Sequence, residues 1–174
     1  MYGTNAISWT RGEINRLEVI QNKIGRLALG ANMGTGTEAI RGDMGWSTFE
    51  ERFMKGKLSF KARIDNMQGD RWVREICLQV GYKTCWMRNC AAMARDVGMG
   101  RTWDFSRAGI NQWRMAIANG DRRVLSSKEL KPLIKQKVEG YGLEKWVKGI
   151  ESKRTLNLYR SKKCPGREWF YNGS

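Results

Sequence analysis

The side chains that could do chemistry in this chain are mostly cations. Thirty-two Lys and Arg residues outnumber seventeen Asp and Glu residues, which gives a formal net charge of +15. Such a chain is attracted to polyanions, meaning RNA, DNA or an acidic membrane surface. The chain has no histidine and no CxxC pair among its four cysteines, which argues against a zinc site and a triad-type hydrolase. We therefore expect phosphate binding, with no metal and no cofactor.

A glycine-rich stretch, LGANMGTGTEAIRGDMGW at 29–46, is the place to look for a phosphate-binding loop. It lacks the lysine of a P-loop, its GxG is not completed to GxGxxG, and no strand precedes it. The alternative is a joint between helices. We expect Gly30 to end one helix, Thr35 or Thr37 to cap a short second one, and Gly42 with Gly45 to turn the chain into a third.

The elements that must position the cations are predicted to be helices. The chain has only two prolines, and its apolar residues recur at helical rather than strand spacing. The apolar stripes lie at 17–27, 46–67, 72–80, 86–97, 110–117, 130–138, 146–150 and 156–159. We expect an all-α fold, an irregular array of about seven to eight helices joined by short loops that contain glycine.

Helix boundaries are predicted by capping residues. Ser47 with Glu50, and Ser126 with Glu129, have the spacing of a capping box. The turn-rich segment GMGRTWD (98–104) is the best candidate for a hinge. We place the boundary there, between a helical region at 1–98 and a basic helical region at 99–174, with a single domain as the alternative. The glycines expected just past helix ends are Gly30, Gly69, Gly98 and Gly120.

The helix over 46–67 carries an unusual charge, because Lys57 falls on its apolar side. Lys57 is expected either to face a bound phosphate or to extend past its neighbours to water. Other cations follow helix flanks, where phosphate contact and an ordinary solvated face are both open. The candidate nucleic-acid-binding residues are Lys23, Arg26, Arg41, Arg52, Lys55, Lys57, Lys61, Arg63, Lys153, Arg154, Lys162 and Lys163.

Aromatic residues offer a second way to bind nucleic acid. Trp146 and Tyr159 lie close to the cations of the C-terminal part, where aromatic rings could stack on unpaired bases. Core packing is the stronger expectation for the tryptophans on apolar stripes. Cys90 lies on a stripe and is expected to be an inert core thiol. The tryptophans on stripes are Trp46, Trp72, Trp86, Trp113 and Trp146.

The order of several segments resembles a known family. LEVIQNKIGRLALGA (17–31), TEAIRGDMGW (37–46) and FEERFMKGKLSFKARIDNM (49–67) resemble the region after the palm in reverse transcriptases of non-LTR (LINE-type) retrotransposons. WVKGIESKRTLNLYRSKK (146–163) is similar to the downstream W…K-x-x-L-x-x-Y-x-x-x-K segment of that family. The resemblance covers about residues 2–75, including the opening Tyr2-Gly3, and 146–163.

This resemblance implies a helical thumb and connector that grip a template–primer duplex. The family's aromatic-x-Asp-Asp palm motif is missing, since the chain has no Asp-Asp pair to hold two metal ions. The resemblance therefore implies a fragment of an RNA-directed DNA polymerase that is not catalytic alone. The implied partners are RNA, DNA or an RNA–DNA hybrid, together with the palm domain.

A second class of function remains open at the level of the sequence. The chain could be a helical protein-interaction module, or an inactive retroelement remnant. Apolar stripes left without the palm would be exposed, which predicts self-association. No apolar run of about 20 residues is present, so no membrane span is expected. The expected location is intracellular, in the nucleus or the cytoplasm.

Overall fold

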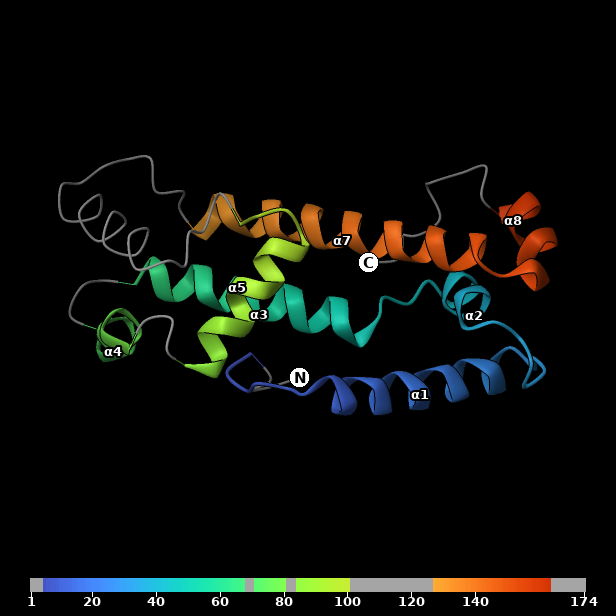
Figure 1. Ribbon diagram of the computed structural model, residues 1–174, viewed down its shortest axis with the longest axis horizontal. Helices are drawn as coiled ribbons and strands as arrows, with labels where there is room; N and C mark the ends of the chain where they lie inside the picture. Colours follow the sequence, from blue (N-terminus) through green and yellow to red (C-terminus); the bar gives the residue numbers. More distant parts are fainter. Residues whose placement is uncertain (1–4, 68–70, 81–83, 101–126, 164–174) are drawn as a thin grey trace. The chain divides into compact units, whose positions relative to one another are not determined.

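The computed structural model describes residues 5–67, 71–80, 84–100 and 127–163, and every regular element in these ranges is helical (Figure 1). This confirms the all-α prediction. The elements are α1 (Arg11–Ala28), α2 (Thr37–Met44), α3 (Phe49–Asp65), α4 (Trp72–Val80), α5 (Cys85–Asp96), α7 (Ser127–Glu151), the short 3-10 helix η2 (Arg154–Leu156) and α8 (Asn157–Lys163). The stripe predicted at 110–117 lies outside the described residues.

The chain divides into two compact units that are interleaved along the sequence. Unit 1 comprises residues 1–8 and 52–141, and unit 2 comprises residues 9–51 and 142–174. This division differs from the expected boundary between 98 and 99. The helices α3 and α7 each contribute residues to both units, so neither unit is a continuous stretch of chain.

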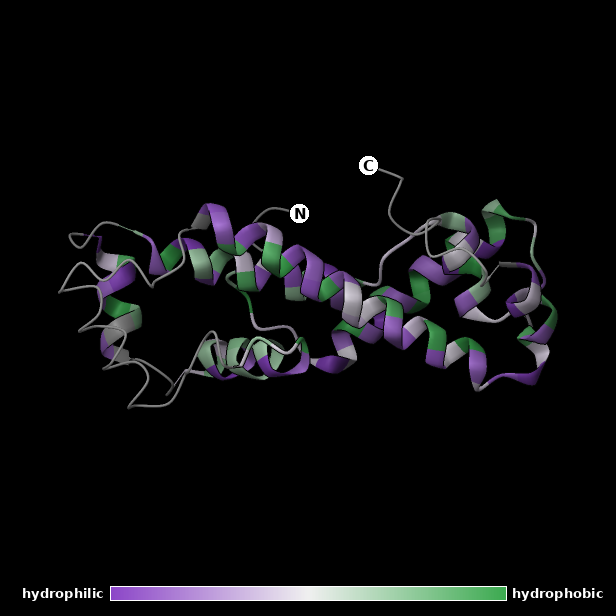
Figure 2. Cartoon of the chain, turned by 90° about the horizontal axis from the view of Figure 1, so that it is seen from above, coloured by the Kyte–Doolittle hydropathy of each residue, from purple (hydrophilic) through white to green (hydrophobic). Residues whose placement is uncertain are grey.

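Unit 1 has an aliphatic core built from three helices. On α3, Met54, Leu58 and Ala62 follow one another at intervals of four residues and are buried. This spacing places them on one side of the helix, where they meet buried residues of α5 and α7. Along the helices in Figure 2, green hydrophobic residues recur among purple hydrophilic ones. The rest of this core is Ala94, Val97, Met99, Leu130, Ile134 and Val138.

Unit 2 has a smaller apolar core with polar connections around it. Ala39, Ile150 and Leu156 are buried together, with the rings of Trp146 and Tyr159 packed against them. A side chain on Gly25 would be 2.5 Å from Ile40, so glycine is what lets α1 approach α2 this closely. The polar contacts that complete unit 2 involve several of the predicted phosphate-binding cations.

The helix ends confirm some predicted caps and correct others. Gly30 and Gly98 have positive φ angles of 60° and 72°, as expected just past a helix end. The α2 helix begins after Gly36, which makes no side-chain cap, so the expected threonine cap is wrong. The capping box of α3 is Thr48 with Glu51, one residue later than predicted. The expected caps at Gly69, Gly120 and Ser126 lie outside the described residues.

The single helix α7 replaces two predicted ones. It runs for 25 residues through Pro132 near its start and through Gly140 and Gly142. A glycine inside a helix costs about 1 kcal/mol, which tertiary contacts can offset. A side chain on Gly142 would be 2.5 Å from the carboxyl carbon of Glu51 in unit 2. Gly142 is therefore needed because the side chain of Glu51 approaches the backbone of α7 closely, and it does not mark a break in the helix.

The apolar stripes are not all buried. Trp72 is 81% exposed and Ile76 is 53% exposed, so the expected core position of the α4 stripe is wrong. Cys90 is fully buried, as expected, and burial raises the pKa of its thiol to about 12. Trp46, Trp86 and Trp146 are half-buried, whereas Trp113 lies outside the described residues. No described helix is both long and apolar enough to cross a membrane.

Candidate nucleic-acid interface

The α3 helix divides its cations between a buried and an exposed side. Lys57 is 3% exposed and Lys61 is 7% exposed, so both lie inside unit 1. This corrects the expectation that they face a phosphate, because a phosphate cannot reach a side chain covered by protein. The alternative expectation, that Lys57 extends past its neighbours to water, is also wrong, because its side chain is covered. Lys61 instead forms a buried ion pair with Asp65, one turn further along the helix.

Burial changes the ionisation of this interior group of side chains. Desolvation lowers the pKa of Lys57, against the opposing effect of Cys90 and Cys85. Desolvation also raises the pKa of Asp65, although Lys61 and Arg74 act in the other direction. Buried charges are costly unless they are paired, so the Lys61–Asp65 pair is a structural feature of unit 1 rather than a surface for a ligand.

The exposed side of α3 presents Arg52, Lys55 and Arg63. At 100° per residue, these three side chains lie within about 80° of one another. Arg52 and Arg63 are separated by about 16 Å along the helix axis. The other residue of α3 within this arc, Ser59, is uncharged.

This basic face of α3, defined as Arg52, Lys55 and Arg63, suits a polyanion. Duplex DNA carries one negative charge per about 1.7 Å of its axis, so a 16 Å row of cations spans several phosphates. Contacts of this kind hold the nucleic-acid backbone without reading its sequence. The face belongs to α3, which is anchored in the unit 1 core through its buried residues Leu58 and Ala62.

Two of the predicted cations of α1 and α2, Arg26 and Arg41, have partners inside unit 2. Arg26 donates from Nη2 to the carbonyl oxygen of Thr35 at 3.0 Å, which holds the loop between the two helices. Arg41 pairs with Glu18 at 3.2 Å. The phosphate contact expected at Arg41 would have to compete with this carboxylate. Lys23 is exposed on α1.

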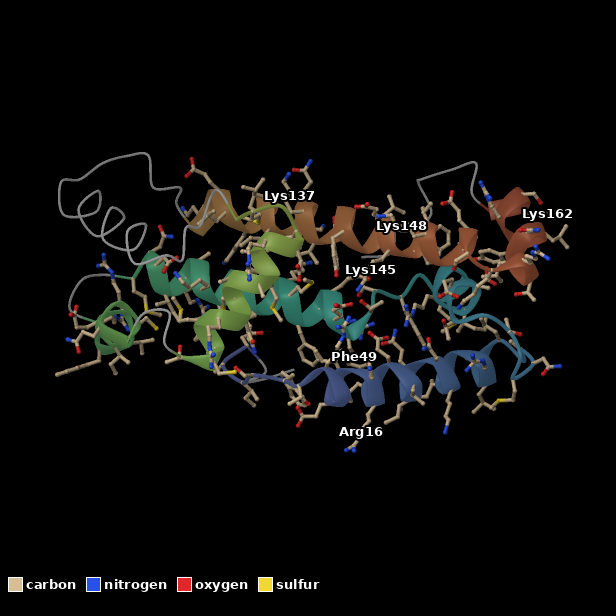
Figure 3. The ribbon with its side chains drawn as sticks, in the orientation of Figure 1. Arg16, Phe49, Lys137, Lys145, Lys148 and Lys162 are labelled. Carbon is tan, nitrogen blue, oxygen red and sulfur yellow. The ribbon has the colours of Figure 1, made fainter. Side chains whose placement is uncertain are left out.

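One of the predicted C-terminal cations, Lys153, is less available than expected. Lys153 pairs with Glu38 at 2.6 Å, while Arg154 and Lys162 are exposed. The side chain of Lys163 lies outside the described part. Figure 3 shows Lys162 on α8.

The aromatic residues near these cations hold unit 2 together. The indole nitrogen of Trp146 donates to the carbonyl oxygen of Glu38 at 2.9 Å. The hydroxyl of Tyr159 lies 3.3 Å from the carbonyl oxygen of Ala39 and 3.2 Å from a carboxylate oxygen of Asp43. Both rings pack on the small core, so this structure supports their core interpretation rather than base stacking.

The α7 helix carries a row of exposed cations that is not among the predicted site residues. Lys128, Lys131 and Lys135 are exposed on the first half of α7, and their i, i+3, i+7 spacing places them on one face. Lys135 lies 3.9 Å from Glu139. The spacing is visible in the sequence, although the cations are denser after residue 145. These lysines and the basic face of α3 both belong to unit 1.

Comparison of the chain with protein-family models, with curated proteins and with solved structures finds no match. The assignment of function therefore rests on the residues themselves.

Proposed function

We propose that this chain binds nucleic acid through backbone phosphates, as a non-catalytic thumb-like fragment of a LINE-type reverse transcriptase. The observation that carries the proposal is the basic face of α3, whose three cations share one exposed side. The net charge of +15 supports it, because binding without sequence specificity depends on summed phosphate contacts.

The resemblance to the retrotransposon family also points to α3 as the binding helix. The segment FEERFMKGKLSFKARIDNM, which carries part of that resemblance, spans α3 and the two residues after it. In this proposal the template–primer duplex lies along the exposed side of α3, and the palm domain of a parent polymerase would supply the catalytic carboxylates. The chain alone binds but does not polymerise.

Fluorescence anisotropy of a labelled RNA–DNA hybrid, titrated at several salt concentrations, tests the proposal. Binding should weaken steeply as salt rises, since phosphate contacts release counterions. The triple variant Arg52→Gln/Lys55→Gln/Arg63→Gln should bind more weakly. The slope of log affinity against log salt should fall by about 0.9 for each phosphate that the variant no longer neutralises, and so by up to about 3.

A matched variant separates local contact from total charge. Lys145→Gln/Lys148→Gln/Arg160→Gln removes the same charge from cations that already pair with Glu50, Glu144 and Glu151. It should bind the hybrid almost as well as the unaltered chain. Equal losses of affinity in the two triple variants would show that only the overall charge matters, and the basic face of α3 would then be abandoned as the binding surface.

A further inference from the structure

The α1 helix exposes its apolar side. Val19, Ile20, Ile24 and Leu27 are 53%, 54%, 54% and 84% exposed, respectively. Single exposed apolar residues are ordinary, but four on one helix face form a patch of the kind that marks an interaction site. We name these four residues the α1 stripe.

The opposite side of α1 is polar and is fixed in place. Gln21 and Asn22 are buried, and the side-chain amide of Gln21 donates to the carbonyl oxygen of Ser47 at 3.2 Å. A carboxylate oxygen of Glu18 accepts from the backbone N–H of Phe49 at 2.6 Å, at the start of α3. Rotating α1 to bury its stripe would break these contacts, so the stripe stays outside.

Cations lie within the stripe rather than along its edges. Arg16 and Lys23 are both exposed, and the order Arg16, Ile20, Lys23, Leu27 follows one line along α1 at intervals of four, three and four residues. Residues at these intervals are neighbours on a helix surface. Any partner that covers the apolar residues must therefore also accept two positive charges.

We propose that the α1 stripe docks an amphipathic helix of another protein, with carboxylates placed among its apolar residues. Its apolar side chains would cover Ile20, Ile24 and Leu27, while its Glu or Asp residues pair with Arg16 and Lys23. Recognition of an amphipathic helix through anchors at such intervals is a recurrent mode of peptide binding. Charge complementarity determines which helices bind.

Two other occupants fit these charges less well. A second copy of this chain would bring the same two cations, and Glu13, the acidic residue nearest the line, already accepts from the N–H and hydroxyl of Thr10. A membrane surface would draw Lys23 toward acyl chains, because Lys23 lies between Ile20 and Leu27. Interfacial helices carry their cations on the polar side instead.

Three designed peptides of about 18 residues, long enough to match α1, test the proposal. The first alternates Leu and Glu on one face to complement the line from Arg16 to Leu27. The second has Lys in place of Glu, and the third keeps Glu but has Ser in place of Leu. Anisotropy at about 150 mM salt, where long-range charge is screened, should show clear binding of the first peptide alone.

Substitutions on α1 identify the surface. Leu27→Gln should weaken binding of the first peptide at least about tenfold, by removing the most exposed apolar anchor. Lys23→Glu should weaken it similarly and should improve binding of the Lys peptide. Arg11→Glu makes the same charge change on another side of α1, at its exposed start, and should leave both affinities unchanged. Circular dichroism should show that all three variants keep their helix content.

Several outcomes would overturn the proposal. Equal binding of the first and third peptides, or equal effects of Lys23→Glu and Arg11→Glu, would mean general attraction to a basic chain. Failure of all peptides to bind at about 100 μM would contradict the docking surface, since specific contacts are tighter than this. Sedimentation that shows dimers in the unaltered chain but not in Leu27→Gln would assign the stripe to a second copy. Vesicles of phosphatidylserine and phosphatidylcholine that bind the chain through Leu27 would assign it to lipid.

Discussion

The two units of this chain are stabilised by different kinds of contact. Among the residues that the structure describes, unit 1 buries nine aliphatic or sulfur-containing residues in one cluster, to which α3, α5 and α7 all contribute. In the described part of unit 2, three apolar residues are buried together, and its elements are connected by the carboxylates of Glu18 and Glu38 and by Tyr159. Apolar packing is non-directional, whereas each polar contact needs one particular partner. Unit 2 should therefore depend on single polar side chains, whereas the residues of the unit 1 core are replaceable by others of similar shape.

The largest expected effect is in the core of unit 1. Leu58 is fully buried, so Leu58→Ala should lower the free energy of unfolding by about 2–5 kcal/mol, because it removes buried apolar area and leaves a cavity. Leu158→Ala, at a leucine that is 73% exposed, is the control and should change stability by less than about 0.5 kcal/mol. Urea unfolding followed by circular dichroism measures both. Similar values for the two variants would contradict the assignment of the core.

In unit 2, one carboxylate should matter nearly as much. Glu18→Gln removes the charge that pairs with Arg41 and weakens the acceptor for the first N–H groups of α3. Since the partners are partly buried, we expect the free energy of unfolding to fall by about 1–3 kcal/mol in the same experiment. Glu144→Gln removes a carboxylate from an exposed ion pair on α7 and should have little effect. If Glu144→Gln were as harmful as Glu18→Gln, the distinction between the two carboxylates would fail.

A smaller effect is expected from removing one hydroxyl. Tyr159→Phe keeps the ring on the unit 2 core but removes the hydroxyl that lies against Ala39 and Asp43. A hydrogen bond of this kind contributes about 1 kcal/mol, so the free energy of unfolding should fall by about that amount. A variant as stable as the unaltered chain would show that water replaces both hydrogen bonds. The polar connections of unit 2 would then matter less than its apolar core.

The smallest effect should appear in the dependence of stability on pH. Burial raises the pKa of Glu38, but hydrogen bonds and the charge of Lys153 outweigh it, so the pKa lies below its ordinary value of 4.5. The stabilising contribution is therefore complete above about pH 4.5 and is lost as the pH falls through the folded-state pKa. The difference in unfolding free energy between the unaltered chain and Glu38→Gln should be constant from about pH 7 to 5. It should shrink in more acidic solution, and a difference that grew there would reverse the assigned direction.

The sequence predicted what depends on local periodicity. The helical class, the end of the first helix at Gly30 and the burial of Cys90 follow from spacing within a turn or two. Which side of a helix is buried depends on distant residues. An apolar stripe predicts an inward side, yet α1 turns that side outward because Glu18 and Gln21 bond to residues near the start of α3.

The candidate site shows the same limit. The sequence predicts five phosphate-binding cations on α3. Three of them, Arg52, Lys55 and Arg63, are exposed, whereas Lys57 and Lys61 are buried. Helical periodicity places Lys61 between the buried residues Ile64 and Leu58, but whether that side of the helix is covered depends on residues from elsewhere in unit 1. The carboxylate partners of Arg41 and Lys153 lie 23 and 115 residues away in the sequence. Local spacing therefore does not reveal that these two cations are paired.

The interleaving of the units has a consequence for synthesis on the ribosome. Every segment of unit 1 is available once residue 141 has left the exit tunnel, whereas unit 2 needs residues that follow it. The contacts of Glu38 and Ala39 with the C-terminal part span 108 to 120 residues of sequence. Contacts between such distant residues form slowly. During translation, α1 and α2 must therefore wait for the last fifth of the chain, and the nascent protein passes through a stage in which every segment of unit 1 has been synthesised but unit 2 still lacks its C-terminal part.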